Sequence, residues 1–175
     1  EQIWNRTINA RGESIFDKPS FKLPAHKGRC ILPLDGFFEH HRRNGKVFPY
    51  FIKSADHKRM LIAAIKDSWT NKSTGEIIES FSIVTTPGNT LLSELHNNPK
   101  LKGPRMPLIL NETDTNQWLN GNPEEAKELV ISNNDIELEA FTVQKLKGKT
   151  YVGNLPEVQK KHSYPELNDA PDLFN

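Results

Sequence analysis

The sequence predicts an α+β fold with mostly antiparallel strands and short flanking helices. Apolar runs of strand length are separated by turns rich in Asn, Gly and Pro, and the chain has twelve prolines and ten glycines. Asn44-Gly45 stands between two β-prone runs, and the helical segments are few and short. We expect one domain over residues 1–175, because this is an ordinary domain length that can bury a core.

The N-terminal part predicts a short strand over Arg6–Asn9. A helical turn that carries Ile15 and Phe16 follows and ends before Pro19, because proline restricts the residue that precedes it. Residues 18–29 alternate lysines with isolated apolar residues and two prolines. We therefore expect them to form a loop.

The next segment predicts a β-hairpin. An apolar run over Cys30–Phe38 ends in Glu39, and a second run rich in valine and aromatic residues follows Asn44-Gly45. Asn-Gly accepts the positive φ angles of a tight hairpin turn. Glu39 is then expected on the first strand, near the polar tip, with Asp35-Gly36 as a bend or bulge.

Glu39 has two interpretations at this point. Contact with Phe37 and Phe38 would desolvate the carboxyl group, raise its pKa and suit it to proton transfer near neutral pH. Alternatively, Glu39 is a solvated side chain on a strand edge that pairs with Arg42 or Arg43. The local sequence alone favours the second interpretation.

The middle of the chain predicts two strands, a turn between them and a helix. The expected elements are a buried strand over Met60–Lys66, a turn over Asn71–Gly75, a strand over Ile77–Thr86, a helix over Thr90–Leu95 closed by His96, and a polar loop over Asn97–Pro104.

The C-terminal third predicts a short strand, two helices and a last strand. Met106–Leu110 reads as the strand, and Asn111 is expected to cap a helix that runs through Trp118 and Leu119. Asn122-Pro123 followed by two glutamates predicts a second helix that ends near Ile131. Residues 137–143 alternate as a strand, and the tail, including residues 165–175, is expected to be irregular.

The charge is unevenly distributed along the chain. Residues 1–60 carry 12 Lys/Arg and 6 Asp/Glu, residues 61–140 carry 6 and 12, and the remainder carries 5 and 4, which sums to the net +1. A basic first third suits a polyanion-binding face. The alternative is that these regions pack together and leave a mixed surface.

Cysteine content and hydropathy indicate a cytoplasmic protein. One cysteine, Cys30, excludes an intrachain disulfide and offers no metal-ligand pattern, which favours a reducing compartment. The mean hydropathy is −0.63, and there is neither a membrane-spanning run nor a signal-peptide pattern. We expect a cytoplasmic monomer, associated with the nucleoid when bound to DNA, without a metal, a cofactor or a membrane partner.

Four segments hold candidate functional residues: Asn9-Ala10-Arg11, Glu39, Thr85 through His96, and Arg105-Met106-Pro107. Each has a structural alternative. Asn9 suits a turn, Arg11 and Arg105 suit surface cations, and His96 suits the C-terminal dipole of a helix.

Taken together, these segments resemble the SRAP family, the SOS response-associated peptidases. The resemblance rests on INARGE, RCILPLDGFFEH, FSIVTT followed by a helix that ends in LH, RMPLIL and YVGN, in that order, from about Trp4 to about Leu167. It implies a curved, barrel-like, mostly antiparallel sheet with short helices.

The resemblance also implies a covalent sensor of abasic sites in single-stranded DNA. In this family, the amine and thiol of an N-terminal cysteine attack the ring-opened sugar, and a Schiff base closes to a thiazolidine crosslink. Asn9 would position the nucleophile or adduct, Glu39 would be the general acid and base, also for crosslink reversal, and His96 would help to open the sugar.

By the same resemblance, Arg11 would bind a flanking DNA phosphate, with Thr85 and Arg105 as further DNA contacts. Single-stranded DNA needs a cationic groove and exposed aromatic faces, which the basic first third with Phe37, Phe38 and Tyr50 could supply. The alternative is that these aromatic side chains belong to the core, which is the more common case.

The sequence departs from the family pattern in two places. No Met-Cys precedes Glu1, so the chain as written is not expected to form the crosslink; either a segment precedes Glu1 or the protein is a non-catalytic remnant. Gly103 occupies the family's usual histidine position, two residues before the Arg of RMP. His96 keeps the family's distance from Thr85, so we interpret Asn97–Pro104 as including an insertion.

Two alternative functions remain. One is a non-covalent module for single-stranded DNA on the same fold. The other is a peptidase that acts on other proteins, for which Cys30 is the only candidate thiol, although a buried small hydrophobic residue is the favoured interpretation of Cys30.

Overall fold

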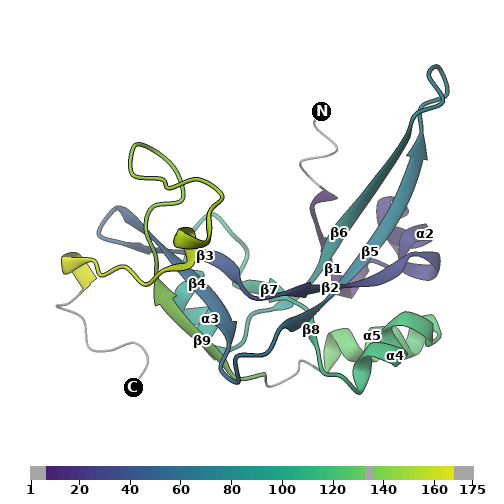
Figure 1. Ribbon diagram of the computed structural model, residues 1–175. Coiled ribbons are helices and arrows are strands. Elements are labelled where there is room, and N and C mark those ends of the chain that lie inside the picture. The colour runs from purple at the N-terminus through teal and green to yellow at the C-terminus, as the bar shows by residue number, and fades with distance from the viewer. Residues whose placement is uncertain (1–6, 133–135, 168–175) are drawn as a thin grey trace. The chain divides into compact units, whose positions relative to one another are not determined.

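The computed structural model describes residues 7–132 and 136–167, which form two compact units (Figure 1). Unit 1 comprises Glu1–Leu34, Met60–Pro87 and Arg105–Ile136, and unit 2 comprises Asp35–Arg59, Gly88–Pro104 and Glu137–Asn175. In the described part of the chain, more residues lie in strands than in helices, and all but one of the pairings between named strands are antiparallel. The predicted α+β class with curved, mostly antiparallel strands is confirmed.

Unit 1 is built on a six-stranded sheet with the order β1-β6-β5-β2. The short strands β7 and β8 pair with β6 and β5. The strands are β1 (Asn9–Arg11), β2 (Arg29–Leu34), β5 (Met60–Thr70), β6 (Ile77–Pro87), β7 (Arg105–Pro107) and β8 (Ile109–Leu110). Among the strands that the structure describes, only β1 pairs parallel, with its Arg11 opposite Thr85 of β6.

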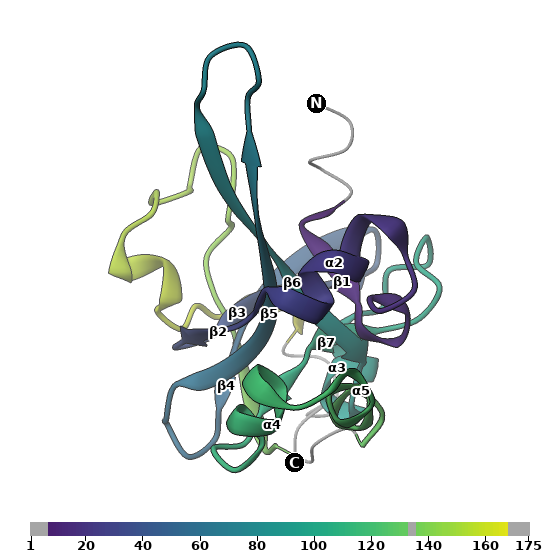
Figure 2. The same ribbon diagram turned by 90° about the vertical axis from the view of Figure 1, so that its right-hand side faces the viewer.

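Strands β5 and β6 form a long hairpin around the predicted turn at residues 71–75. Gly75 there has φ +74°, and the Asn71 N–H donates to the Glu76 carbonyl at 2.8 Å. Figure 2 shows the hairpin continuing well past α2 as a two-stranded ribbon. Its base is buried, whereas Lys66–Thr70 are exposed, so only the first half of β5 belongs to the core.

The helices α2 (Pro19–Lys27), α4 (Asp114–Asn120) and α5 (Pro123–Ile131) pack in unit 1, with α4 and α5 side by side (Figure 1). The fully buried Trp118 donates its indole N–H to the Cys30 carbonyl at 3.0 Å, which fastens α4 to β2. The core joins apolar residues of these helices to the sheet: Ala10, Ile15, Phe16, Phe21, Ala25, Ala63, Ile65, Val84, Leu108, Leu110, Trp118, Ala126, Leu129 and Val130.

The helix α2 corrects the loop predicted for residues 18–29. Pro19 occupies its first turn, where a missing N–H is harmless, but Pro24 lies inside the helix. Phe21, Pro24 and Ala25 are buried, so tertiary packing offsets the lost hydrogen bond. Basic residues interspersed with isolated apolar residues had suggested a loop, but packing supports a helix.

The first strand and the helix α4 also differ from their predictions. The first strand is Asn9–Arg11 rather than the predicted Arg6–Asn9. Arg6 lies outside the described residues. A 3-10 helix over Gly12–Ser14 precedes Ile15. The helix α4 begins after Thr113 without a side-chain cap, so Asn111 is not its cap.

Unit 2 contains a three-stranded antiparallel sheet with the order β3-β4-β9. Its strands are β3 (Phe37–Arg43), β4 (Lys46–Ser54) and β9 (Leu138–Thr142), and α3 (Thr90–Leu95) packs against β3. Aromatic rings fill its interior: Phe51 contacts Phe38 and Phe141, and Phe48 contacts Tyr164. Two 3-10 helices, Pro156–Gln159 and Pro165–Leu167, interrupt the predicted irregular tail, whose last residues lie outside the described part.

The predicted hairpin exists, but its first strand is shorter than expected. Asn44 and Gly45 have φ angles of 49° and 73°, as the tight turn requires, and join β3 to β4. Arg29–Leu34 is a separate strand in unit 1, which pairs with β5, and the chain bends at Asp35. The predicted bend at Asp35-Gly36 is therefore where the chain passes from one unit to the other.

The helices α3 and α5 match their predictions closely. Asn89 caps α3 by accepting the Leu92 N–H, and the helix ends at His96 as expected. Asn122 and Glu125 form a complete capping box at the start of α5, and the helix ends at Ile131.

Candidate functional site

Unit 2 brings two of the predicted catalytic residues into contact. Glu39 Oε2 lies 3.0 Å from His96 Nδ1, and the two side chains are 21% and 12% exposed. The contact is an ion pair when the imidazole is protonated, and it is a hydrogen bond when neutral His96 carries its proton on Nδ1.

The backbone around Glu39 also holds its carboxylate. Oε1 accepts the backbone N–H of His40 at 2.7 Å, so both carboxylate oxygens have partners within unit 2. The expectation that Glu39 pairs with Arg42 or Arg43 is wrong, because α3 and its C-terminal end pack against this strand and bring in His96. Strand β3 is nevertheless an edge strand of its sheet.

The position of His96 follows from the packing of α3. Leu92 and Leu95 are fully buried and anchor the short helix, and the His96 N–H donates to the Leu92 carbonyl at 2.8 Å. The imidazole then turns to Glu39 instead of serving only the helix dipole, which was the simpler interpretation. A carboxylate and an imidazole in contact, with limited solvent access, can hold and transfer a proton.

Unit 1 brings together a second group of predicted site residues around Arg105. Its Nη2 donates to the Thr85 carbonyl at 2.7 Å and to Thr85 Oγ1 at 3.1 Å. The same guanidinium holds Glu13 in a two-pronged ion pair with distances of 2.5 and 2.8 Å. The side-chain hydrogen bond from Arg105 lowers the pKa of Glu13 below its ordinary value.

Arg105 thereby joins the strand edge at β6 and β7 to the segment after β1. A planar guanidinium matches a carboxylate well in this geometry. The predicted DNA contacts of Arg105 and Thr85 stay predictions; in the structure, both residues already bind each other.

The other two predicted residues of unit 1, Asn9 and Arg11, are exposed on β1. They lie two residues apart on one side of the strand, and Ala10 between them is buried. Thr85, opposite Arg11, donates its hydroxyl to the Ala10 carbonyl at 3.3 Å. Arg11 is therefore open to a ligand on the face that also presents Asn9.

Sequence reasoning missed two residues that support these groups. Glu13 lies in the INARGE segment, but its partner Arg105 is 92 residues away. Asn97 lies in the loop after α3 and bonds the backbone of Arg42 in β3 with both ends of its amide. Glu13 could have been suspected from its place in the motif, whereas Asn97 had no comparable signal.

Cys30 does not have the surroundings of an activated nucleophile. It lies on β2 opposite Ala64, is partly exposed, and has its thiol pKa raised by burial. A raised pKa leaves less thiolate at neutral pH. Cys30 is less buried than the sequence suggested, but its environment is that of a structural residue.

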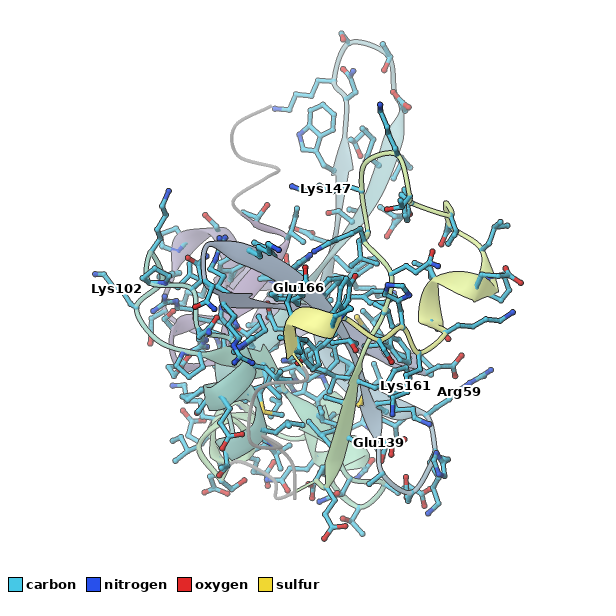
Figure 3. All side chains as sticks on the ribbon, turned by 90° about the vertical axis from the view of Figure 1, so that its left-hand side faces the viewer. Arg59, Lys102, Glu139, Lys147, Lys161 and Glu166 are labelled. Atoms are coloured by element: carbon cyan, nitrogen blue, oxygen red, sulfur yellow. The ribbon has the colours of Figure 1, made fainter. Side chains whose placement is uncertain are left out.

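Part of the positive charge of the basic first third is used in packing within unit 1. Arg29 donates to the carbonyls of Ala25, Trp118 and Gly121, so it joins α2 to α4 and its neighbouring turn. In unit 2, the charged side chains labelled in Figure 3 are of both signs: Arg59, Lys102, Glu139, Lys147, Lys161 and Glu166. The basic polyanion-binding face therefore stays a prediction.

The described residues include no helix long and apolar enough to cross a membrane. Within the same part of the chain, no group of three or more His, Cys, Asp or Glu side chains is arranged to hold a metal ion.

The family model for SOS response associated peptidase (SRAP) matches residues 1–150. The chain belongs to the SRAP family. This SRAP protein is 31% identical over 166 residues to the abasic site processing protein YoqW of Bacillus subtilis, with 93% of this chain and 70% of the relative covered. It is 33% identical over 141 residues to the abasic site processing protein HMCES of Pongo abelii, covering 65% of this chain and 38% of the relative.

Two solved structures share the fold of this chain. A crystal structure of a Bacteroides thetaiotaomicron protein matches this SRAP chain with a TM-score of 0.79 and 32% identity, covering 93% of this chain and 68% of that one. A Bordetella bronchiseptica protein matches with a TM-score of 0.69 and 27% identity, covering 78% of this chain and 65% of that one. The fold predicted from the family resemblance is therefore confirmed.

Proposed function

We propose that this SRAP protein processes abasic sites in single-stranded DNA by forming a covalent crosslink. The observation that carries the proposal is the contact between Glu39 and His96 in a member of a family whose relatives are named abasic site processing proteins. The nucleophile would be the amine of the family's N-terminal cysteine, which is not among residues 1–175.

The chemistry requires a group that moves protons at the sugar aldehyde in three steps: addition, loss of water and ring closure. The amine adds to the carbonyl carbon, and the resulting carbinolamine loses water to give a Schiff base; the thiol then adds to that carbon and closes a thiazolidine. The Glu39 carboxylate accepts a proton from the attacking amine and returns it to the carbonyl oxygen, which becomes the carbinolamine hydroxyl. Glu39 in its protonated form then donates a second proton to that hydroxyl, which leaves as water, and the resulting carboxylate accepts the proton of the thiol as sulfur adds to the Schiff-base carbon. The reverse sequence hydrolyses the crosslink with the same groups.

His96 has a supporting role in this scheme. It shares a proton with Glu39 at 3.0 Å and assists opening of the sugar ring, from which the aldehyde arises. Asn9 positions the nucleophile or its adduct through its side-chain amide. These roles follow the family pattern, and the exposure of Asn9 on β1 allows such a contact.

Arg11 is the strongest candidate for DNA binding in unit 1. It is exposed on β1, where a phosphate can reach its guanidinium. Arg105 is engaged with Glu13 and Thr85, so its contribution would be to support this face or to form a secondary phosphate contact. We further propose that the protein acts as a cytoplasmic monomer in the response to DNA damage.

Two other functions make different predictions. A non-covalent single-stranded DNA module would bind with a steep salt dependence and form no adduct that survives denaturation. A peptidase that acts on other proteins would need an activated nucleophile, and Cys30, with its raised pKa, does not supply one. The family name points to peptidase activity, which we assign to autocatalytic removal of the initiator methionine.

A denaturing gel tests the proposal directly. The complete gene product is incubated with single-stranded DNA that contains one abasic site, beside an intact strand of the same sequence. A shifted band with the abasic strand alone is the expected result. Binding to both strands without a denaturant-resistant band would support the non-covalent module instead.

A further inference from the structure

Strand β3 exposes a row of backbone groups along the edge that does not pair with β4. Two of its N–H groups are bound by side chains: that of His40 by Glu39 at 2.7 Å, and that of Arg42 by Asn97 at 2.7 Å. Asn97 also donates its amide N–H to the Arg42 carbonyl at 2.7 Å. One side chain thus reproduces the pair of hydrogen bonds that a neighbouring strand would make.

Three consecutive residues, beginning with the last residue of α3, contact β3. The Leu95 carbonyl lies 3.3 Å from Nδ1 of the buried His41, His96 contacts Glu39, and Asn97 binds Arg42. His96 therefore stands between two residues that are both fixed to the same strand. Its ring has little freedom to leave Glu39 as long as both attachments hold.

We propose that Asn97 is a positioning residue that holds His96 against Glu39 by clamping the loop to the edge of β3. The proposal deepens, and rests on, the proposed function, because the contact it protects is the one assigned to proton transfer. Without the clamp, the loop over residues 97–104, which forms no helix or strand, would leave the edge of β3 more often. Small displacements of a catalytic group lower rates strongly.

The first experiment measures crosslink formation by Asn97→Ala in the complete gene product. We expect the first-order rate constant to fall about tenfold, while the affinity for intact single-stranded DNA is unchanged. Asn98→Ala is the matched control, because Asn98 accepts the Lys100 N–H within its own turn, and it should crosslink at the parent rate. Asn97→Asp keeps the acceptor for the Arg42 N–H but loses the donor, so its loss should be smaller.

A double-mutant cycle separates positioning from a general effect on stability. If Asn97 acts through His96, then Asn97→Ala in a His96→Ala protein lowers the rate no further. A full tenfold additional loss would show that Asn97 acts independently of His96 and would overturn the proposal.

Histidine side-chain NMR signals give a readout that needs no crosslinking. The ring signals of His96 are identified as those missing from the spectrum of His96→Ala. In the parent protein, Glu39→Gln should shift these signals. In a protein that already carries Asn97→Ala, adding Glu39→Gln should leave the His96 signals nearly unchanged. If the parent forms no crosslink, the proposed function fails, and this comparison still decides the role of Asn97. If Asn97→Ala does not fold, Asn97→Asp takes its place in both experiments. The proposal would be overturned if the Asn97 variant crosslinked at the parent rate and its His96 signals still shifted on Glu39→Gln.

Discussion

Glu39 and His96 meet at 3.0 Å although they are 57 residues apart in the sequence, and each lies on a different kind of element. The strand presents the carboxylate, and the end of a six-residue helix presents the imidazole. The sequence offered a solvated glutamate and a helix-capping histidine as the simpler interpretations. Their contact makes the proton-transfer interpretation the stronger one for both residues.

Glu39→Gln should slow crosslinking without abolishing DNA binding. The amide keeps the size of the side chain and can still bond to its neighbours, but it cannot donate and accept a proton near neutral pH. General acid–base groups contribute roughly 10²–10⁴-fold, so a loss of about 10²-fold or more in the crosslinking rate is expected. Gel kinetics measure the rate, and fluorescence anisotropy with an intact strand measures affinity.

Glu79→Gln is the matched control, because Glu79 is an exposed acid on β6. It should leave the crosslinking rate unchanged. Glu39 would have a structural role if Glu39→Gln lowered the crosslinking rate and the DNA affinity and also abolished the thermal unfolding transition seen by circular dichroism. The assignment of Glu39 as the general acid and base would then be wrong.

Arg11→Ala should weaken binding to single-stranded DNA and flatten its salt dependence. Each phosphate contact that is removed lowers the slope of log K against log salt by about 0.7 for a single strand. Titrations at several salt concentrations measure the slope. Arg59→Ala, which removes an exposed arginine of unit 2 paired with Asp35, is the control and should leave the slope as it was. An unchanged slope in Arg11→Ala would remove Arg11 from the phosphate site.

Local signals in the sequence predicted the elements that have local causes. Asn44-Gly45 fixed a hairpin because its two positive φ angles are properties of two adjacent residues. Asn122 and Glu125 predicted the start of α5 because a capping box closes within four residues. Such features do not depend on the rest of the chain.

The predictions failed where distant packing decides the structure. Pro24 is tolerated inside α2 because that turn of the helix is buried, which no local pattern announces. Arg29–Leu34 and Phe37–Arg43 read as one strand, but they pair with β5 and β4 in different units. The single domain predicted over residues 1–175 stays a prediction beside the two units found.

The candidate site shows the same difference between what local motifs reveal and what distant packing decides. Family resemblance supplied Asn9, Arg11, Glu39, Thr85, His96 and Arg105, and the structure adds which of them touch. The contacts of Glu13 with Arg105 and of Asn97 with Arg42 join residues tens of positions apart. Neither pair has a sequence spacing that a periodic pattern could reveal.

Cys30 should react slowly with a thiol reagent in the native protein. Burial raises the pKa of its thiol. The backbone around Cys30 is also held in place, because β2 pairs with β5 and the Cys30 carbonyl accepts the indole N–H of Trp118. Mixing with an aromatic disulfide at neutral pH, monitored by absorbance, should give a rate that rises strongly in denaturant. Fast native labelling would contradict the structural role of Cys30 and revive the peptidase alternative.

Glu13→Gln should reduce stability at neutral pH and matter less in acid. The Arg105 hydrogen bond lowers the folded-state pKa of Glu13 below the unfolded value near 4.5, so the native state favours the ionised form. The stabilisation is fully present above the unfolded pKa and disappears as the pH falls through the folded pKa. Because Glu13 is 44% exposed and solvent screens the pair, the neutral-pH loss should be about 1 kcal/mol or less.

Urea unfolding of the parent protein and of Glu13→Gln at pH 7, 5 and 3.5 measures this difference. The two free energies of unfolding should converge as the pH falls, because protonation of Glu13 removes the charge that Arg105 binds. Glu112→Gln, in an exposed turn before α4, is the control and should track the parent at pH 7 and 5. A difference between parent and Glu13→Gln that stays constant from pH 7 to 3.5 would mean that Glu13 contributes through packing rather than through its charge.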